Sequence, residues 1–155
     1  KIPNFNKKID LQGVNIILED INDPGNLGTI IRVCDWFGVK NIYCSYQSVD
    51  VYNPKVVQST MGSISRVRVV YTDLYKMITN LEDNVDLYAA IMDGEDLDNI
   101  KISKKSLIVL GNESHGISED LLSLIENKIT IRRVGLADSL NVGIATGIIL
   151  NKFCC

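Results

Sequence analysis

The chain has 155 residues, 46% of them hydrophobic and 23% charged, with a formal net charge of −3. These values are typical of one globular domain and exclude disordered and fibrous proteins, and the net charge gives no sign of a strongly basic nucleic-acid-binding domain. The charge is unevenly distributed, however, because seven acidic residues and no Lys or Arg lie within residues 82–98. The rest of the chain, with 16 basic and 12 acidic residues, is mildly basic.

Short apolar runs alternate with helical patterns along the chain. In chain order, the pattern predicts a strand at 15–20, a helix after the turn at 23–25, a strand at 41–44, a helix from Pro54, a strand at 67–70, a helix at 73–81, strands at 87–91 and 107–110, a helix at 118–125, a strand at 128–131 and a final helix from Asn141. This alternation predicts an α/β domain with a mostly parallel sheet.

Capping residues support several of these boundaries. Gly38 suits the C-terminal cap of the first helix, and Asp73 and Ser118 suit N-caps. The acidic stretch at 82–98 is interpreted as partly strand and partly a loop containing Gly94, on a solvated surface.

The four cysteines, at 34, 44, 154 and 155, include no CxxC pair, and His115 is the only histidine. We therefore expect no metal site. Cys34 and Cys44 lie in apolar runs and are predicted to pack as small hydrophobic residues, while the pair at 154–155 is predicted to be exposed. Free thiols and the lack of a signal peptide indicate a cytoplasmic protein, and the longest apolar stretch, 142–150, is too short to cross a membrane.

Three segments rich in Gly, Asn and Ser, at 23–28, 111–116 and 135–141, follow predicted strands, where open α/β sheets bind ligands. The first lacks the third glycine of a dinucleotide-binding turn and the GK[ST] ending of a phosphate-binding loop. The second resembles the nucleophile elbow of a serine hydrolase around Ser114, but no base is available because the only histidine is the next residue. In the third, Ser139 or Asn141 can cap the final helix.

Together, the order and spacing of these segments resemble the catalytic domain of the SpoU/TrmH family of RNA 2′-O-methyltransferases. The matching motifs are DPGNLGTIIR at 23–32, LGNE at 110–113 with GIS at 116–118, and Ile131 followed by Gly135 and by SLNV at 139–142. The resemblance extends over residues 13–152. It implies an α/β-knot (SPOUT) fold with a mostly parallel sheet, in which the C-terminal segment forms a deep trefoil knot.

The resemblance also implies an enzyme that uses S-adenosylmethionine to methylate a ribose 2′-hydroxyl of rRNA or tRNA. It implies a homodimer whose helices pack across the two-fold axis and whose RNA site is shared between subunits. Residues 13–155 would form the catalytic domain, and residues 1–12 a lead-in or the remnant of a linker. Because the chain begins with Lys1 and its first motif resembles that of members with an N-terminal RNA-binding domain, we expect it to be part of a longer protein.

Functional residues of the family match positions of this sequence. The resemblance implies catalytic roles for Asn26, Arg32, Glu113, Ser139 and Asn141. It implies cofactor contacts, largely through backbone groups, for Leu110, Gly111, Asn112, Gly116, Ile131, Gly135, Ser139 and Leu140. A guanidinium stays protonated, so we expect Arg32 to bind an RNA phosphate and to stabilise the developing alkoxide rather than to act as a base. The other four would hold Arg32 and the loops in place.

Arg132 and Arg133 stand where the family usually has Pro-Met, and they either add phosphate contacts or weaken cofactor binding. Two other functions stay open. A catalytically silent paralogue would bind RNA without methylating it, although the complete catalytic set argues against this. An NAD-dependent oxidoreductase would use the turn at 25–28 and would leave the other two motifs unexplained.

Overall fold

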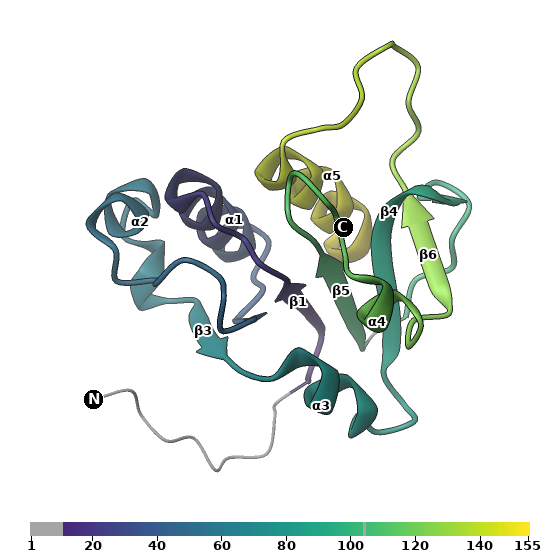
Figure 1. The fold of residues 1–155 in the computed structure, drawn as a ribbon, viewed down its shortest axis with the longest axis horizontal. Helices are drawn as coiled ribbons and strands as arrows, with labels where there is room; N and C mark the ends of the chain where they lie inside the picture. The colour runs from purple at the N-terminus through teal and green to yellow at the C-terminus, as the bar shows by residue number, and fades with distance from the viewer. Residues whose placement is uncertain (1–10, 104) are drawn as a thin grey trace.

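The computed structural model describes residues 11–103 and 105–155, so most of the predicted lead-in at 1–12 lies outside the described residues. Strands and helices alternate along the chain (Figure 1). In chain order they are β1 (Val14–Leu18), α1 (Pro24–Trp36), β2 (Asn41–Cys44), α2 (Pro54–Ser59), the 3₁₀ helix η1 (Ser63–Ser65), β3 (Arg68–Tyr71), α3 (Leu74–Thr79), β4 (Asp86–Asp96), β5 (Ser106–Leu110), α4 (Glu119–Leu122), β6 (Asn127–Thr130) and α5 (Val142–Cys154).

Within the described residues, six parallel strands form one sheet in the order β3-β2-β1-β5-β4-β6. Ile16 of β1 pairs with Ile42 of β2 on one side and with Ile108 of β5 on the other. The prediction of an α/β domain with a mostly parallel sheet is confirmed. Since parallel strands end at the same edge of a sheet, the connections that follow β1 and β5 begin side by side.

Helices cover both faces of the sheet (Figure 1). Successive side chains along a strand point to opposite faces of the sheet, so every second residue shares a face. Ile16 and Leu18 therefore belong to a buried cluster with residues of α1, α2 and α5, and Ile17 belongs to a second cluster with residues of α3 and α4. Burial on both faces explains the continuous apolar runs by which the sequence predicts the inner strands.

α1 begins and ends as its capping residues predict. Oδ1 of Asp23 accepts a hydrogen bond from the backbone N–H of Asn26 at 2.8 Å, and Pro24 occupies the first turn. Gly38, with φ of 75°, follows the last turn in the left-handed conformation of a C-terminal cap. The N-terminal cap places Asn26 in the first turn of α1, just beyond the end of β1.

The predicted loop around Gly94 is wrong. β4 continues through this glycine to Asp96, because Glu95 and Asp96 pair with Ile129 and Thr130 of β6 after a shift in register. A Cβ at Gly94 would lie 2.5 Å from the carbonyl carbon of Ile129, so the glycine lets the two strands meet.

α3 and α4 are shorter than predicted. α3 ends at Thr79, and Nδ2 of Asn80 donates to the carbonyl oxygen of Lys76 at 2.7 Å just beyond it. α4 ends at Leu122. Beyond it, the N–H groups of Leu124 and Ile125 donate to the carbonyl oxygens of the residues three positions earlier, as in a 3₁₀ turn, and not four positions earlier as in an α-helix.

The cysteines occupy the environments that the sequence predicts. Cys34 and Cys44 are buried and free, and burial raises the pKa of both thiols, that of Cys44 to about 12. Both therefore pack as neutral apolar groups, whereas Cys154 and Cys155 are exposed. Within residues 11–103 and 105–155, no helix is long and apolar enough to cross a membrane. The same residues include no cluster of three or more His, Cys, Asp or Glu side chains that could hold a metal ion.

Candidate active site

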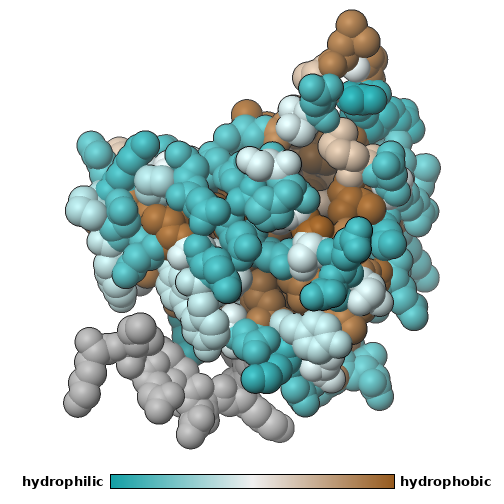
Figure 2. All heavy atoms as spheres, viewed as in Figure 1, coloured by the Kyte–Doolittle hydropathy of each residue, from teal (hydrophilic) through white to brown (hydrophobic). Residues whose placement is uncertain are grey.

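A cavity of about 680 Å³ lies beyond the ends of β5 and β6. Its walls come mainly from three parts of the chain, which are the connection from β5 to α4, the loop from β6 to α5, and one side of α5. Figure 2 shows hydrophobic residues, in brown, below the loop that projects from the body of the molecule. This volume and lining are typical of sites for small molecules and cofactors.

The connection from β5 to α4 closes on itself in a tight turn. The backbone groups of Asn112 and Gly116 bond to each other in both directions, at 3.1 and 2.9 Å, and Oδ1 of Asn112 accepts the N–H of Ser114 at 2.8 Å. A Cβ at Gly111 would lie 2.2 Å from the carbonyl carbon of Gly116. Only glycine therefore allows the turn to pack this closely against the end of β5.

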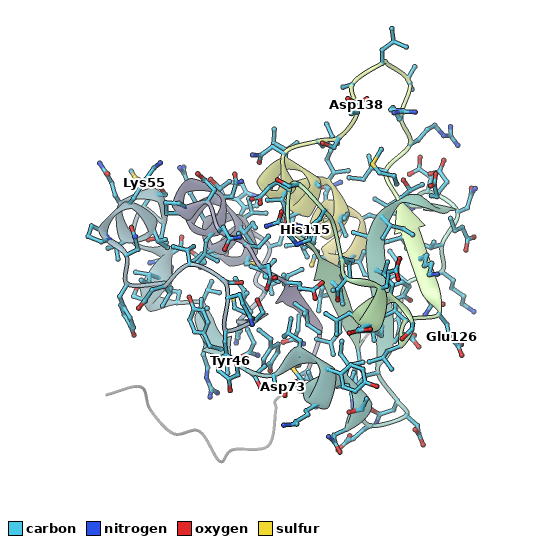
Figure 3. The ribbon with its side chains drawn as sticks, in the orientation of Figure 1. Tyr46, Lys55, Asp73, His115, Glu126 and Asp138 are labelled. Carbon is cyan, nitrogen blue, oxygen red and sulfur yellow. The ribbon has the colours of Figure 1, made fainter. Side chains whose placement is uncertain are left out.

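The tip of this turn carries Glu113, Ser114 and His115, and all three line the cavity with exposed side chains. In Figure 3, His115 lies on the connection from β5 to α4 where this connection passes in front of α5. The sequence predicts His115 to be a loop residue, and the structure adds that this loop forms one wall of the cavity.

Asn26, Glu113 and Asn141 come from three distant segments and form one chain of hydrogen bonds. Nδ2 of Asn141 donates to Oδ1 of Asn26 at 2.8 Å, and Nδ2 of Asn26 donates to Oε1 of Glu113 at 2.5 Å. Oδ1 of Asn141 also accepts the N–H groups of Gly143 and Ile144, which makes Asn141 the cap of α5. Bonds on both sides therefore set the orientation of each amide.

The loop from β6 to α5 projects from the body of the molecule, as Figure 1 shows, and Figure 3 places Asp138 on it. Residues 132–140 are all exposed. Val134 and Leu136 leave 92% and 98% of their surface uncovered. The loop thus lines the cavity on one side and is open to solvent on the other.

Two arginines begin this loop, and both have partners. Nε of Arg132 donates to Oδ2 of Asp96 on β4 at 2.6 Å, and Nη1 of Arg133 donates to the carbonyl oxygen of Ala137 at 3.4 Å. The backbone N–H of Asp98 and the Arg132 guanidinium hold the pKa of Asp96 below its usual value. Asp96 therefore connects the start of the loop to β4. The sequence predicts a solvated surface for this acidic stretch, and the structure adds this specific contact.

The structure brings most of the predicted site residues together. All eight residues predicted to contact the cofactor line the cavity, namely Leu110, Gly111, Asn112, Gly116, Ile131, Gly135, Ser139 and Leu140. Among the predicted catalytic residues, Glu113 and Ser139 line the cavity as well, and Asn26 and Asn141 join Glu113 through the hydrogen bonds described above.

Arg32 lies apart from the other predicted catalytic residues. It is exposed on α1 and is not among the residues that line the cavity. Within the described part of the chain, no hydrogen bond joins it to Asn26, Glu113, Ser139 or Asn141. In a single chain, the asparagines and Glu113 hold one another rather than Arg32.

Several lining residues are not among the candidate catalytic and cofactor-binding residues that the sequence identifies. They are apolar side chains from β4, β6 and α5, including Ala90, Ile129, Val142, Ala145 and Ile149. The spacing of the last three residues, at i, i+3 and i+7, places them on one side of α5, and this is the signal by which they could have been found.

A second groove, of about 410 Å³, lies between α1 and α5. It is lined by Val33, Trp36, Phe37, Gly147, Ile148 and Asn151. Trp36 is 85% exposed, and Ile144 and Ile148 on α5 are also exposed. In the single chain, α5 therefore has one buried apolar side and one uncovered apolar side.

The fold and the cavity define an α/β protein with a cofactor-sized site at the carboxyl edge of a parallel sheet. The sequence profile of the SpoU rRNA Methylase family matches residues 13–151. The chain belongs to this family, which confirms the resemblance inferred from its three motifs.

Two related proteins that are named as RNA methyltransferases support this assignment. The chain is 30% identical over 137 residues to the 23S rRNA (guanosine(2553)-2′-O)-methyltransferase RlmP of Bacillus subtilis, covering 87% of this chain and 55% of that protein. It is also 30% identical over 141 residues to the tRNA (guanosine(18)-2′-O)-methyltransferase of Thermus thermophilus, covering 88% of this chain and 72% of that protein. The chain thus spans little more than half the length of the B. subtilis relative.

Solved structures share the fold. An RNA methyltransferase assigned to the TrmH family from Porphyromonas gingivalis matches with a TM-score of 0.89 and 33% identity, over 97% of this chain and 62% of that one. The AdoMet-bound rRNA methyltransferase from Sinorhizobium meliloti matches with a TM-score of 0.87 and 32% identity, over 93% of this chain and 57% of that one.

Proposed function

We propose that the chain binds S-adenosylmethionine in the 680 Å³ cavity and transfers its methyl group to a ribose 2′-hydroxyl of rRNA or tRNA. The observation that carries this proposal is the convergence of the three motif segments on one site. The second and third segments line the cavity, and Asn26 of the first bonds to Glu113 and Asn141 of the other two. The named relatives methylate rRNA or tRNA at 2′-oxygens.

The cavity suits S-adenosylmethionine in its chemistry. Gly111 lets the turn at 112–116 pack against the end of β5 and so shapes one wall, and Ile131, Leu140 and Ile149 add apolar surface that an adenine ring can pack against. We assign cofactor contacts to the lining residues Leu110, Gly111, Asn112, Gly116, Ile131, Gly135, Ser139 and Leu140. The related S. meliloti structure holds AdoMet.

S-adenosylmethionine, when bound, supplies an electrophilic methyl group whose C–S bond breaks as a C–O bond to the ribose forms, leaving S-adenosylhomocysteine. The chain must hold the ribose hydroxyl in line with this methyl group. The bonds from Asn141 to Asn26 and from Asn26 to Glu113 keep the two cavity loops in a fixed relation to α1. We assign Asn26, Glu113, Ser139 and Asn141 to this positioning.

Arg32 is the residue that we propose to contact the RNA. Its guanidinium stays protonated and so cannot serve as a general base. It binds an RNA phosphate and stabilises the negative charge that develops on the 2′-oxygen, and the phosphate assists removal of the proton.

The groove between α1 and α5 supports a homodimer. Trp36, Ile144 and Ile148 form an exposed apolar surface on these two helices, and a two-fold contact between copies would cover it. Arg32 is the neighbour of Val33, which lines the groove, so Arg32 would lie beside the proposed contact between the subunits. An RNA site shared between subunits accounts for the place of Arg32 outside the cavity of its own chain.

We infer in addition that the segment after β6 forms the trefoil knot of the α/β-knot fold. Two features support this. The connection from β5 to α4 arches in front of α5 in Figure 1, and residues of this connection and of α5 line the same cavity. We further propose that residues 13–155 form the catalytic domain and residues 1–12 lead into it, and that the protein works in the cytoplasm, where its thiols stay reduced.

The test of the proposed function measures binding and methyl transfer separately. The full-length protein is titrated with S-adenosylmethionine and with NAD by calorimetry. It is then incubated with labelled S-adenosylmethionine and total rRNA or tRNA, and the modified nucleotide is mapped. We expect binding of S-adenosylmethionine, none of NAD, and label on a ribose 2′-oxygen. Cofactor binding without transfer to either RNA would indicate a silent paralogue, and binding of NAD alone would indicate an oxidoreductase.

Arg32→Ala tests the assignment of this residue in single-turnover reactions. We expect the rate of methyl transfer to fall by about 100-fold or more, because a cation that stabilises developing charge is lost. Lys55→Ala is the control, since it removes an exposed cation from α2, and it should leave the rate unchanged. A wild-type rate in Arg32→Ala would show that Arg32 does not stabilise the reaction.

A further inference from the structure

Glu19, the residue that follows β1, holds the far end of the β5–α4 connection. Its carboxylate accepts two hydrogen bonds from Ser118, one from the backbone N–H at 2.8 Å and one from Oγ at 2.6 Å. Glu19 also donates its backbone N–H to the carbonyl oxygen of Leu110 at 3.0 Å. Both contacts are made to residues that bound the connection, 91 and 99 positions further along the chain.

Asp20 holds the near end of the same connection. Its φ of 55° is left-handed, and its carbonyl oxygen accepts a hydrogen bond from Nδ2 of Asn112 at 2.7 Å. Ser45 supports this conformation, because its Oγ donates to Oδ1 of Asp20 at 2.7 Å and accepts the N–H of Asp20 at 2.9 Å. The unusual backbone conformation is therefore held by bonds on both sides of the residue.

The connection is thus fixed to Asp20 at Asn112 and to Glu19 at Ser118. Between these two attachments lie Glu113, Ser114 and His115, which line the cavity. Hydrogen bonds to a charged acceptor are stronger than those between neutral groups, so the Glu19 attachment contributes much of the hold on this wall.

We propose that Glu19 is a positioning residue for the cofactor cavity, acting through Ser118 to keep the β5–α4 connection closed against β5. The proposal rests on the proposed function for the identity of the ligand. It adds a residue outside the three family motifs, one that neither lines the cavity nor bonds to Asn26.

If Glu19 only stabilised the fold, its replacement would lower the free energy of unfolding and leave the cavity unchanged. Asp73→Ala provides the matched control, because Oδ1 of Asp73 also accepts a backbone N–H, that of Lys76 at 3.0 Å, at the start of α3 and away from the cavity-lining residues. Glu19→Gln provides the conservative variant, since its carbonyl oxygen can still accept the N–H of Ser118 while the charge is lost.

The experiment uses the full chain and two readouts, hydrogen exchange of the amides at 112–118 without ligand, and the affinity for S-adenosylmethionine by calorimetry. We expect Glu19→Ala to speed exchange and to weaken binding, each by about tenfold. Glu19→Gln should lie between it and the wild type, and Asp73→Ala should leave both readouts unchanged. Unchanged exchange in Glu19→Ala, unchanged affinity in Glu19→Ala, or equal changes in Asp73→Ala would each overturn the proposal.

The two readouts separate this proposal from the proposed function. If the wild-type protein binds no S-adenosylmethionine, the proposed function fails, and the exchange rates alone decide whether Glu19 holds the connection. If the wild type binds and Glu19→Ala binds equally well, the proposed function stands and the role of Glu19 is refuted. Glu19→Gln preserves the size of the side chain and so provides a folded variant if Glu19→Ala proves unstable.

Discussion

Asn26 and Glu113 are 87 residues apart in the chain, and Nδ2 of Asn26 donates a hydrogen bond to Oε1 of Glu113 at 2.5 Å. Oδ1 of the same amide accepts a hydrogen bond from Asn141. An asparagine suits this position because it offers a donor and an acceptor at the end of one short side chain. The two cavity loops are thereby both attached to the first turn of α1.

Asn26→Asp should disrupt this arrangement more than Asn26→Ala. The aspartate loses the donor and turns a second carboxylate toward Glu113, so we expect a loss of about 2 kcal/mol in the free energy of unfolding and at least about tenfold in methyl transfer. Asn80→Asp removes an amide donor at the end of α3 and should leave methyl transfer unchanged. Stability is measured by denaturant titration and transfer by single-turnover kinetics, and equal transfer rates for Asn26→Asp and the wild type would contradict this role.

Gly111→Ala and Gly135→Ala form a matched pair, since both glycines line the cavity. A Cβ at Gly111 would lie 2.2 Å from backbone atoms of Gly116, whereas a Cβ at Gly135 would meet nothing within 4 Å. We expect Gly111→Ala to cost about 3 kcal/mol of the free energy of unfolding, and Gly135→Ala less than about 0.5 kcal/mol. Chemical denaturation measures both, and similar values for the two variants would show that the turn can relax.

Trp36→Glu should weaken the proposed dimer. A buried tryptophan at the centre of an interface commonly contributes 2 kcal/mol or more, so we expect the dissociation constant to rise by about 30-fold or more. Tyr52→Glu is the control, because Tyr52 is 78% exposed and is not among the residues of the α1–α5 groove. Sedimentation at several protein concentrations measures the change, and a wild-type protein that stays monomeric at micromolar concentration would refute the dimer.

The pair of Asp35 and Arg66 should make stability depend on pH in the acidic range. The hydrogen bond from Arg66, at 2.7 Å, and that from Ser63 hold the pKa of Asp35 below its usual value. A lowered pKa in the folded state stabilises the protein fully above the unfolded-state pKa, which is about 3.9. This contribution disappears as the pH falls through the lower folded-state value.

We therefore expect Asp35→Asn to destabilise the protein at pH 7 and to have a diminishing effect as the pH falls below about 4. Urea denaturation of the wild type and the variant across this range measures the difference. In an Arg66→Gln background the effect of Asp35→Asn at pH 7 should be smaller, and an unchanged effect there would show that Arg66 is not its cause.

The sequence predicts well those helices and strands whose ends are determined by residues close to them in the chain, such as capping residues. β2 has the predicted bounds, and α1 begins at Pro24 because Asp23 caps it. β4 differs because its continuation past Gly94 depends on pairing with β6, more than 30 residues further along, and an acidic run with a glycine has the local composition of a loop.

In the candidate site, too, the features that depend on nearby residues can be predicted from the sequence, and those that depend on distant residues cannot. Gly111 and Asn112 can be identified from a motif, since their roles depend on a turn of a few residues. The contacts of Glu19 with Ser118 and of Asp96 with Arg132 join strands to distant loops, and no periodicity or spacing indicates them. The apolar lining from β4, β6 and α5 depends likewise on how the layers pack.

The hydrogen bonds that meet at Asn26 span 87 and 115 residues of chain, which has a consequence for folding. Contacts between distant residues require the closure of long loops before they add stability, and they form slowly. During synthesis β1, β2 and β3 can pair as soon as they emerge, whereas Asn141 and the α5 wall of the cavity are made last. The cavity is therefore complete only after α5 has been made, and a nascent chain that stops before α5 can hold a partial sheet but no complete site.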